Sequence, residues 1–349
     1  MSKPKSSISQ ALFFLKDSRI DDWLVSGFKK RGCDVSFIGR TDRANVIGMS
    51  RLLRIKTLHQ QYLKIAWKSL VISARKDVII CYLDVIGMYV FLLSKILLKR
   101  REILVINIMF NDKQDFLTGI KRVLYKIMLR SKHVYPTVIS SELPLLYKKI
   151  FNLPSKVFYV MHDCYGDLDK AIPEKNDEDE YVFCGGTASR DWNLMKEVTY
   201  RLPNNKFVIV GPNKNTLGEN IPPNVKYYYN LPSSEFSHLL NKSSMLALPL
   251  NTEAPAGLIV LFTAGLMSKA VVTTDNLTTR EYIVDGVNGK LVKMRDVDDF
   301  AVQIQELVND KGKRITYGKA LRLKVEEYGS TDSFIDAIIG ITNQIKANL

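Results

Sequence analysis

Two glycines and an arginine form the first group of residues that could bind a phosphate. Gly185 and Gly186 follow an apolar run in the segment YVFCGGTASRDW (residues 181–192), and Arg190 precedes the next predicted helix. Glycine lets the backbone approach a ligand closely, and a guanidinium can hold a phosphate through two parallel hydrogen bonds. The segment therefore suits a diphosphate. The alternative is an ordinary strand–helix turn with a solvated arginine.

A second group lies in residues 251–291, where a helix start stands directly ahead of a buried strand. Residues 257–267 are apolar except for Thr263, which predicts a helix buried on all sides. Its first amides, near Ala256 and Gly257, would have no acceptors within the helix, and the helix dipole adds positive potential there. An anionic ligand fits such a helix start. The alternative is that the glycine only lets the helix begin against a crowded sheet.

Two polar residues, Asn111 and Asp112, follow the apolar run ILVINIMF. This run is expected to be a strand of a parallel sheet, and α/β proteins bind ligands outside the carboxyl ends of such strands. Both residues could therefore contact a reacting substrate, with a plain loop as the alternative.

The residue types that usually bind metals are dispersed, and their spacing predicts no metal site. The four cysteines contain no CxxC pair, which is typical of reduced core residues in a cytoplasmic protein. The motifs GxSxG, HExxH and GxxxxGK[ST] do not occur, so hydrolase-elbow, zincin and P-loop interpretations lose their main support. The residues concerned are His59, His133, His162, His238, Cys33, Cys81, Cys164 and Cys184.

The positive charge of the chain is confined to its first half. Residues 1–165 hold 29 Lys and Arg against 12 Asp and Glu, whereas the remainder holds 21 against 24. Such an asymmetry indicates that one half meets a polyanionic surface, either anionic lipid or nucleic acid. The most apolar segment, residues 85–98, is shorter than the ~20 residues that a bilayer span needs, so no transmembrane helix is predicted.

The elements that must position these residues alternate between strand-length apolar runs and helix-length periodic segments. This alternation predicts an α/β fold with parallel sheets, and 349 residues suffice for two domains. The acidic stretch at 166–180 reads as a linker. The expected organisation is a basic N-terminal domain over 1–165, a C-terminal domain over 181–330, and a final helix over 331–349 that packs back toward the N-terminal domain.

Six blocks of the second half, taken in order, resemble the C-terminal domain of GT-B glycosyltransferases, particularly the family 4-like enzymes of bacterial polysaccharide synthesis. The blocks are GGTASRDW, FVIVGPN, PPNV, SSMLALPL, APAGLIVLFTAGLMSKAVVTT and TTREYIVDGVNGKLV. The resemblance implies two Rossmann-like domains that face each other across a cleft. In that family the C-terminal domain binds a nucleotide-sugar donor and the N-terminal domain binds the acceptor.

The resemblance also implies roles for individual residues. The donor diphosphate would be held by Gly185, Gly186 and Arg190. The nucleotide base would be flanked by Gly211 and by Tyr229, Asn230 and Leu231. The phosphate or donor sugar would meet the backbone amides of Ala256, Gly257 and Leu258. Glu253 would contact the donor sugar, and with Asn111 and Asp112, chosen above for their position after a strand, it completes the candidate catalytic residues.

Thr263 departs from the family pattern, which has a glutamate that grips the nucleotide ribose at this position. A hydroxyl can still hydrogen-bond a ribose, but it lacks the charge that roughly doubles the strength of such a bond.

The sequence thus predicts transfer of a sugar from a nucleotide-sugar donor to a glycan acceptor, expected to be lipid-linked. By family analogy the reaction retains anomeric configuration and needs no metal or other cofactor. The basic half predicts peripheral attachment to the inner face of the cell membrane. A non-catalytic subunit that binds nucleotide-sugar or glycan is the alternative, motivated by Thr263. Nucleic-acid binding rests on charge alone and is not expected, and a GT-B sugar epimerase is a remote further alternative.

Overall fold

A computed structural model describes residues 12–16, 22–39, 51–112, 115–166 and 179–349. The chain divides into two compact units. The first holds the chain up to Met161 together with Phe334–Leu349, and the second is His162–Ser333. Most of the predicted linker, residues 167–178, lies outside the described residues.

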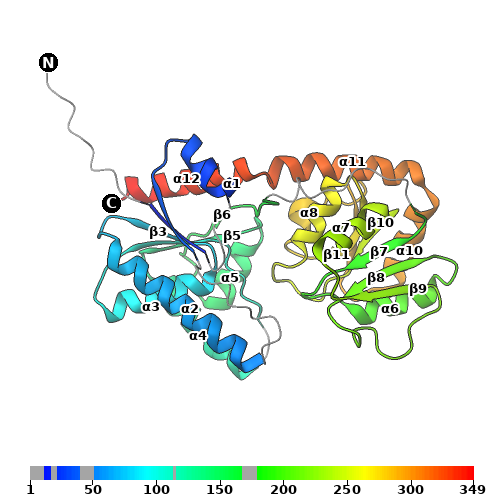
Figure 1. Ribbon diagram of the computed structural model, residues 1–349, viewed down its shortest axis with the longest axis horizontal. Coiled ribbons are helices and arrows are strands. Elements are labelled where there is room, and N and C mark those ends of the chain that lie inside the picture. Colours follow the sequence, from blue (N-terminus) through cyan, green and yellow to red (C-terminus); the bar gives the residue numbers. More distant parts are fainter. Residues whose placement is uncertain (1–11, 17–21, 40–50, 113–114, 167–178) are drawn as a thin grey trace, which may run out of the picture. The chain divides into compact units, whose positions relative to one another are not determined.

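The first unit is a parallel sheet covered by helices (Figure 1). Its strands are β1 (Leu12–Leu15), β2 (Val35–Ile38), β3 (Val78–Cys81), β4 (Glu102–Val105), β5 (Val134–Val138) and β6 (Tyr159–Val160). Its helices are α1 (Asp22–Lys30), α2 (Arg51–Ile72), α3 (Asp84–Ile96), α4 (Phe116–Arg130), α5 (Leu143–Phe151) and most of α12 (Thr331–Ala347). In the described residues the sheet is six-stranded, with the order β2-β1-β3-β4-β5-β6. Strands β1, β3 and β4 are buried at every position, as expected where helices cover both faces.

Helix α12 packs on α1 and on the segment after β3. The ring of Phe334 lies 6.1 Å from that of Trp23 and 6.2 Å from that of Tyr82, centroid to centroid. Asp336 forms an ion pair with Arg31. The last sixteen residues of the chain therefore complete the first unit, although they follow the second unit in sequence.

The second unit is a second parallel sheet with its own helices. Its strands are β7 (Val182–Gly185), β8 (Phe207–Gly211), β9 (Val225–Tyr229), β10 (Met245–Leu248), β11 (Ala270–Asp275) and β12 (Lys290–Lys293). Its helices are α6 (Trp192–Arg201), α7 (Ser233–Lys242), α8 (Leu258–Leu266), α9 (Thr279–Tyr282), α10 (Val297–Asn309) and α11 (Lys311–Tyr328). Among the described residues the sheet is six-stranded, with the order β12-β11-β10-β7-β8-β9. This is the strand order of dinucleotide-binding folds. The chain adds strands on one side of β7 and then on the other, beginning with β10, so the topological switch point lies between β7 and β10.

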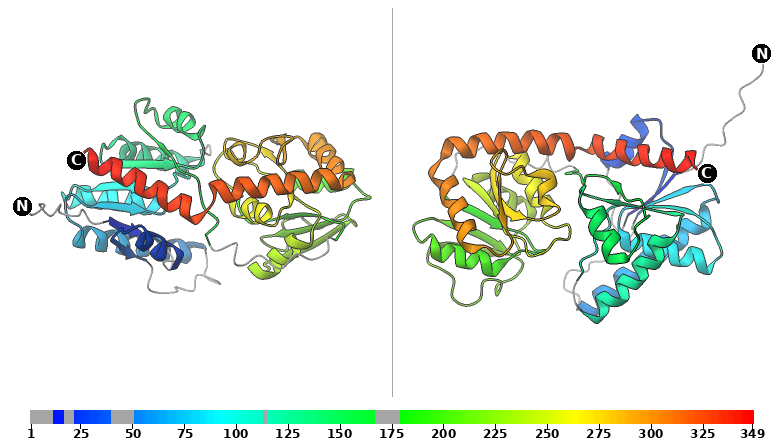
Figure 2. Two further views of the ribbon diagram at one scale, coloured as in Figure 1. Left: turned by 90° about the horizontal axis from the view of Figure 1, so that it is seen from above. Right: turned by 180° about the vertical axis from the view of Figure 1, so that it is seen from behind.

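Helix α8 of the second unit is almost entirely buried. Every residue of α8 is buried except Ile259, which is 68 % exposed in the first turn. The prediction of a helix buried on all sides is thus correct beyond that position. Both views of Figure 2 show α11 alongside α8. A Cβ atom on Gly265 would lie 2.6 Å from Val325 of α11, so glycine permits this close packing.

The predicted fold class, two α/β units with parallel sheets, is confirmed. The predicted strand over 103–109 is shorter than expected, because β4 ends at Val105. Asn107 adopts a left-handed φ of 54°, and its amide donates to the side-chain hydroxyl of Thr137 on β5 at 2.8 Å rather than to a backbone carbonyl. No helix within the described ranges is long and apolar enough to cross a bilayer.

Candidate functional site

Arg190 occupies the switch point of the second sheet. Its Nε donates to the Gly185 carbonyl at the end of β7 at 2.9 Å, and its Nη1 donates to the Ala188 carbonyl at 2.8 Å. The residue is only 5 % exposed. The predicted donor-diphosphate arginine is therefore a buried group that its own loop holds in place, and the alternative of a solvated arginine is wrong.

Gly186 makes room for this guanidinium. Its φ of 126° lies in the region that side chains rarely adopt. A Cβ atom at this position would stand 2.3 Å from Nη2 of Arg190. Glycine is thus required at position 186 by backbone conformation and by close approach to a side chain of the protein itself.

The start of α8 approaches the same guanidinium. Gly257 is the N-cap of α8 with a φ of 82°, and a Cβ atom on it would lie 3.4 Å from Nη1 of Arg190. The first N–H groups of a helix have no acceptors within the helix, and its dipole is positive at this end. The two predicted phosphate-binding segments therefore converge on Arg190.

Two loops of the second unit are bound to each other beside Arg190. Residue 190 bridges to Leu250 after β10, the Asn251 amide donates to the Ser189 carbonyl at 3.1 Å, and the Asp191 amide donates to the Pro249 carbonyl at 3.1 Å. The loops that follow β7 and β10, the strands on either side of the switch point, thus form one rigid edge.

The electrostatics of this edge favour an anion. Within the part of the chain that the structure describes, Arg190 forms no ion pair with a carboxylate. Its hydrogen bonds go to neutral carbonyl groups instead. Burial lowers the pKa of its guanidinium, but arginine stays protonated in proteins. A buried cation beside a helix N-terminus, without a protein counter-ion, is an arrangement that an oxyanion would complete.

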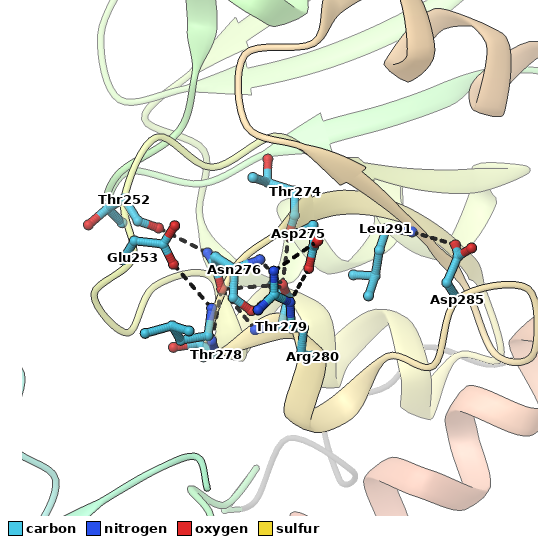
Figure 3. A network of polar contacts seen from close by, with 11 residues as sticks. Thr252, Glu253, Thr274, Asp275, Asn276, Thr278, Thr279, Arg280, Asp285 and Leu291 are labelled. Carbon is cyan, nitrogen blue, oxygen red and sulfur yellow. Dashed lines mark hydrogen bonds and ion pairs between the residues drawn. The ribbon is translucent and has the colours of Figure 1, made fainter. Parts of the chain in front are cut away.

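Glu253 lies on the loop between β10 and α8, close to the start of α9. Its Oε2 accepts a hydrogen bond from the Leu277 amide at 3.2 Å. Asn276, 1 % exposed, links the same loops, because its Nδ2 donates to the Thr252 carbonyl at 2.9 Å and its Oδ1 accepts from the Thr279 amide (Figure 3). The sequence reasoning missed Asn276, whose only signal was an asparagine ahead of two threonines in a polar loop.

Thr263 is buried in α8, and its hydroxyl already has a partner. Its Oγ1 donates to the Ile259 carbonyl one turn earlier at 2.7 Å. The single hydroxyl proton is therefore engaged, and only the lone pairs of the oxygen could accept a bond from a ligand.

The residues predicted to flank a base lie along the same sheet edge. Gly211 ends β8 and pairs in register with Tyr229, which ends β9. Tyr229 is 49 % exposed and stacks on Tyr227 with ring centroids 6.4 Å apart. Asn230 has a left-handed φ of 51° and is exposed, whereas Leu231 is half-buried. An exposed aromatic face is thus present on this edge.

The two other residues predicted to present amides at the start of α8 are Ala256 and Leu258. They flank Gly257, and Ala256 is half-buried whereas Leu258 is buried.

Asn111 and Asp112 belong to the first unit, on the segment between β4 and α4. Asn111 is exposed, and Asp112 forms an ion pair with Arg122 of α4. Asp84 fixes this segment, because its Oδ2 accepts a hydrogen bond from the Met109 amide at 2.9 Å. Asp84 was not predicted as part of any site, because its position at a helix start after a strand is common.

Histidines and cysteines do not assemble into a metal site in the described ranges of the chain. No group of three or more His, Cys, Asp or Glu residues there could hold a metal ion. The four cysteines are free thiols, and two of them, Cys81 and Cys184, are buried in their sheets.

Comparison with known proteins gives this geometry a context. Residues 171–324 match the model of the family described as "Glycosyl transferases group 1". No curated protein matches the sequence.

Several solved structures have a similar fold. A sucrose-phosphate synthase from Thermosynechococcus elongatus is 12% identical, with a TM-score of 0.75, over 97% of this chain and 100% of that one. Anabaena HepE in complex with UDP-glucose is 12% identical, with a TM-score of 0.63, over 96% and 99%. The lipopolysaccharide outer core galactosyltransferase WaaB is 14% identical, with a TM-score of 0.60, over 95% and 99%. The chain therefore has the GT-B fold of the glycosyltransferases, and its second half matches the glycosyl transferases group 1 family.

Proposed function

We propose that the protein transfers a glycosyl group from a nucleotide-sugar donor to a glycan acceptor. One observation carries the proposal: Arg190 is a buried cation, bonded to the Gly185 carbonyl, beside the N-terminus of α8. A nucleotide-sugar supplies a diphosphate, whose negative charge would pair with this cation.

The chemistry follows from where charge develops during the reaction. When the bond between the sugar and the diphosphate breaks, negative charge grows on the departing phosphate oxygens. Fixed donors aimed at that charge stabilise the transition state more than the ground state. Arg190 and the first amides of α8 are such donors, and the bonds between the two loops hold them in place before the substrate arrives.

The finer parts of the proposal concern donor, acceptor and stereochemistry. UDP-sugars are the first donors to test, since HepE, a protein of the same fold, has been solved with UDP-glucose. We assign the acceptor to a lipid-linked glycan of cell-surface polysaccharide synthesis at the inner face of the membrane, in line with the lipopolysaccharide role of WaaB. The anomeric configuration is expected to be retained, with Glu253, Asn111 and Asp112 as candidate contacts of the reacting sugars. Proton NMR of the product anomer tests retention.

The principal experiment replaces Arg190 and measures nucleotide release from UDP- and GDP-sugars, with and without glycan acceptors. Arg190→Ala should reduce turnover by about a hundredfold or more, the usual effect of losing one donor to the developing charge. Arg190→Lys should be intermediate, because it keeps the charge but not the fork geometry. Circular dichroism checks that both variants are folded.

Arg201→Ala is the matched control for that experiment. Arg201 belongs to the same unit but lies on the surface, where it forms an ion pair with Asp298 at 2.6 Å. Its loss should leave turnover unchanged within about twofold, since exposed ion pairs contribute little. If folded Arg190→Ala binds and turns over the donor as the wild type does, the diphosphate is not held at this edge.

A non-catalytic nucleotide-sugar-binding subunit is the second candidate function. It is favoured by Thr263, whose hydroxyl proton is bonded to the Ile259 carbonyl at the position where the family resemblance implies a glutamate. The same nucleotide-release assay separates the two. Saturable UDP binding without turnover for any donor and acceptor supports the subunit, whereas sustained turnover excludes it.

A further inference from the structure

Helix α4 of the first unit has an exposed face that is almost entirely apolar (labelled in Figure 1). Along this face lie Phe116, Ile120, Val123 and Ile127, whose exposed fractions are 82, 45, 57 and 50 %. Leu117, next to the first of them, is 68 % exposed. Five large apolar side chains on one helix of 15 residues form a contiguous stripe rather than scattered exposure.

The stripe lies opposite the face by which α4 packs on its own unit. With about 100° of rotation per residue, the four stripe residues fall within about 60° of one another. The buried residues Thr118, Tyr125, Met128 and Leu129 fall on the other side of the helix. The inner face is anchored, because Tyr125 hydrogen-bonds to Asp84. The outer stripe therefore does not contribute to the core, and its apolar character calls for another partner.

Within α4 the charges are all positive, and Asp115, its N-cap, is an exposed acid beside the first turn. Residues 116–130 contain Lys121, Arg122, Lys126 and Arg130 and no acidic residue. Lys126 and Arg130 border the stripe by the same helical geometry. Beyond the C-terminal end of α4 lies a hollow of about 510 Å³, whose lining includes Arg130, Lys132 and Lys156 and no carboxylate.

We propose that this face of α4 docks on an anionic lipid bilayer, with the apolar stripe among the acyl chains and a headgroup phosphate in the basic hollow. An apolar face bordered by lysine and arginine is the pattern of interfacial helices. A second copy of the chain fits less well, because two stripes would bring together more cations, Lys126 and Arg130, than the one acid at the helix start, Asp115, could pair. Nucleic acid fits poorly as well, since an apolar stripe offers nothing to its backbone. The inference rests on the proposed function for a membrane-borne acceptor, and it names the docking surface.

The test is sedimentation of the full chain with phosphatidylcholine vesicles, with and without phosphatidylglycerol. The wild type should bind strongly only to the anionic vesicles. Phe116→Ser combined with Ile120→Ser should weaken that binding about tenfold or more, through loss of inserted apolar surface. Lys126→Gln combined with Arg130→Gln should weaken it by a similar factor, since each near-surface cation contributes about 1 kcal/mol.

Two double variants serve as controls. Val302→Ser combined with Leu323→Ser removes comparable exposed apolar side chains, 60 and 69 % exposed, from the second unit and should leave vesicle binding unchanged. Trp67→Ser combined with Val71→Ser tests the exposed apolar residues of α2. If only the α2 variant loses binding, or if the wild type ignores anionic lipid, the assignment to α4 is overturned.

Two further measurements distinguish lipid docking from self-association, and a failed docking surface from a failed proposed function. If Phe116→Ser with Ile120→Ser abolishes self-association in analytical ultracentrifugation but leaves vesicle binding intact, the face joins two copies and the lipid assignment is wrong. UDP binding is measured on every variant and should not change, because the α4 residues and Arg190 belong to different units. Vesicle binding without sugar transfer would refute the proposed function and leave the docking surface standing.

Discussion

Each sheet carries a buried ionisable group near the carboxyl ends of its strands, and the two groups have different kinds of partner. In the first unit, Asp84 accepts hydrogen bonds from the Val85 amide at 2.7 Å and the Met109 amide at 2.9 Å. In the second unit, Arg190 donates only to carbonyl groups, and no carboxylate of the described chain pairs with it. The carboxylate thus has donors from its own backbone, whereas the cation still lacks an anion.

This difference separates a supporting residue from a binding residue. Backbone amides that donate to Asp84 fix the loop carrying Asn111, so this carboxylate positions the loop. Carbonyls that accept from Arg190 fix its geometry but leave its full charge without a counter-ion, which is the basis for the proposed anion site. Burial shifts both pKa values toward the neutral forms, upward for Asp84 and downward for Arg190. Burial and a shifted pKa alone therefore do not identify a binding residue. The hydrogen-bond partners of the group distinguish a supporting residue from a candidate binding residue.

Among the changes that keep Arg190, the largest effect is expected from Gly186→Ala, which displaces the guanidinium without removing its charge. The new Cβ atom would stand 2.3 Å from Nη2, at a φ of 126° that alanine tolerates poorly. The guanidinium must then move, and UDP-sugar affinity should fall about tenfold to a hundredfold. Isothermal titration with UDP measures the loss.

Gly218→Ala is the control for Gly186→Ala, because Gly218 also has a positive φ, 74°, in the same unit. A Cβ atom there would meet only Lys196 Nζ at 3.7 Å. This variant should lose about 1 kcal/mol of stability from backbone strain and keep its nucleotide affinity. Equal losses of affinity in both variants would mean that strain, rather than displacement of Arg190, explains the first result.

A smaller effect, on stability rather than binding, is expected from Asp84→Asn. The amide side chain keeps one acceptor but presents a donor to the other backbone N–H, so the free energy of unfolding should fall by about 1–2 kcal/mol. Nucleotide affinity should not change. Chemical denaturation and UDP titration of the same samples check both statements, and a large loss of UDP affinity would contradict the supporting role.

The pH dependence of Asp84 has a definite sign. Burial raises its pKa above the ordinary value of 3.8, so the folded state holds the proton more tightly than the unfolded state does. Its contribution to stability is fully present below the ordinary value and is lost as the pH rises through the raised value. The stability advantage of the wild type over Asp84→Asn should therefore shrink as the pH rises above about 4. An advantage that grows with pH would contradict this.

The sequence was sufficient for the architecture, because apolar runs such as VIIC in β3 and MLAL in β10 leave little choice besides buried parallel strands. The end of β4 was not predictable in this way. Asn107 stops the strand through its left-handed backbone and its bond to Thr137, a residue thirty positions away. Local apolar character continues past Asn107, so periodicity alone extends the strand.

The site shows the same division between local and distant causes. Gly186 and Gly257 were recognised as phosphate-binding candidates from their own neighbourhoods. That both make room for one guanidinium depends on the strand order, which places β7 beside β10. Asn276 was missed because one of its partners, the Thr252 carbonyl, lies on a loop more than twenty residues away, and its bonds to the Thr278 and Thr279 amides alone describe an ordinary turn. Residue type predicts which groups could act, and topology decides which of them meet.

The smallest effect is expected from Thr263→Val, which tests whether any side chain of α8 joins Arg190 in binding the donor. The hydroxyl donates to the Ile259 carbonyl at 2.7 Å, so in this conformation it can only accept from a ribose. Valine has a similar shape, and the lost internal bond should reduce stability by about 1 kcal/mol or less. UDP affinity should change by less than about twofold, as measured by titration beside Arg190→Lys. A tenfold loss would mean that the ribose depends on this hydroxyl, and that the donor is held by the interior of α8 as well as by its N-terminus and Arg190.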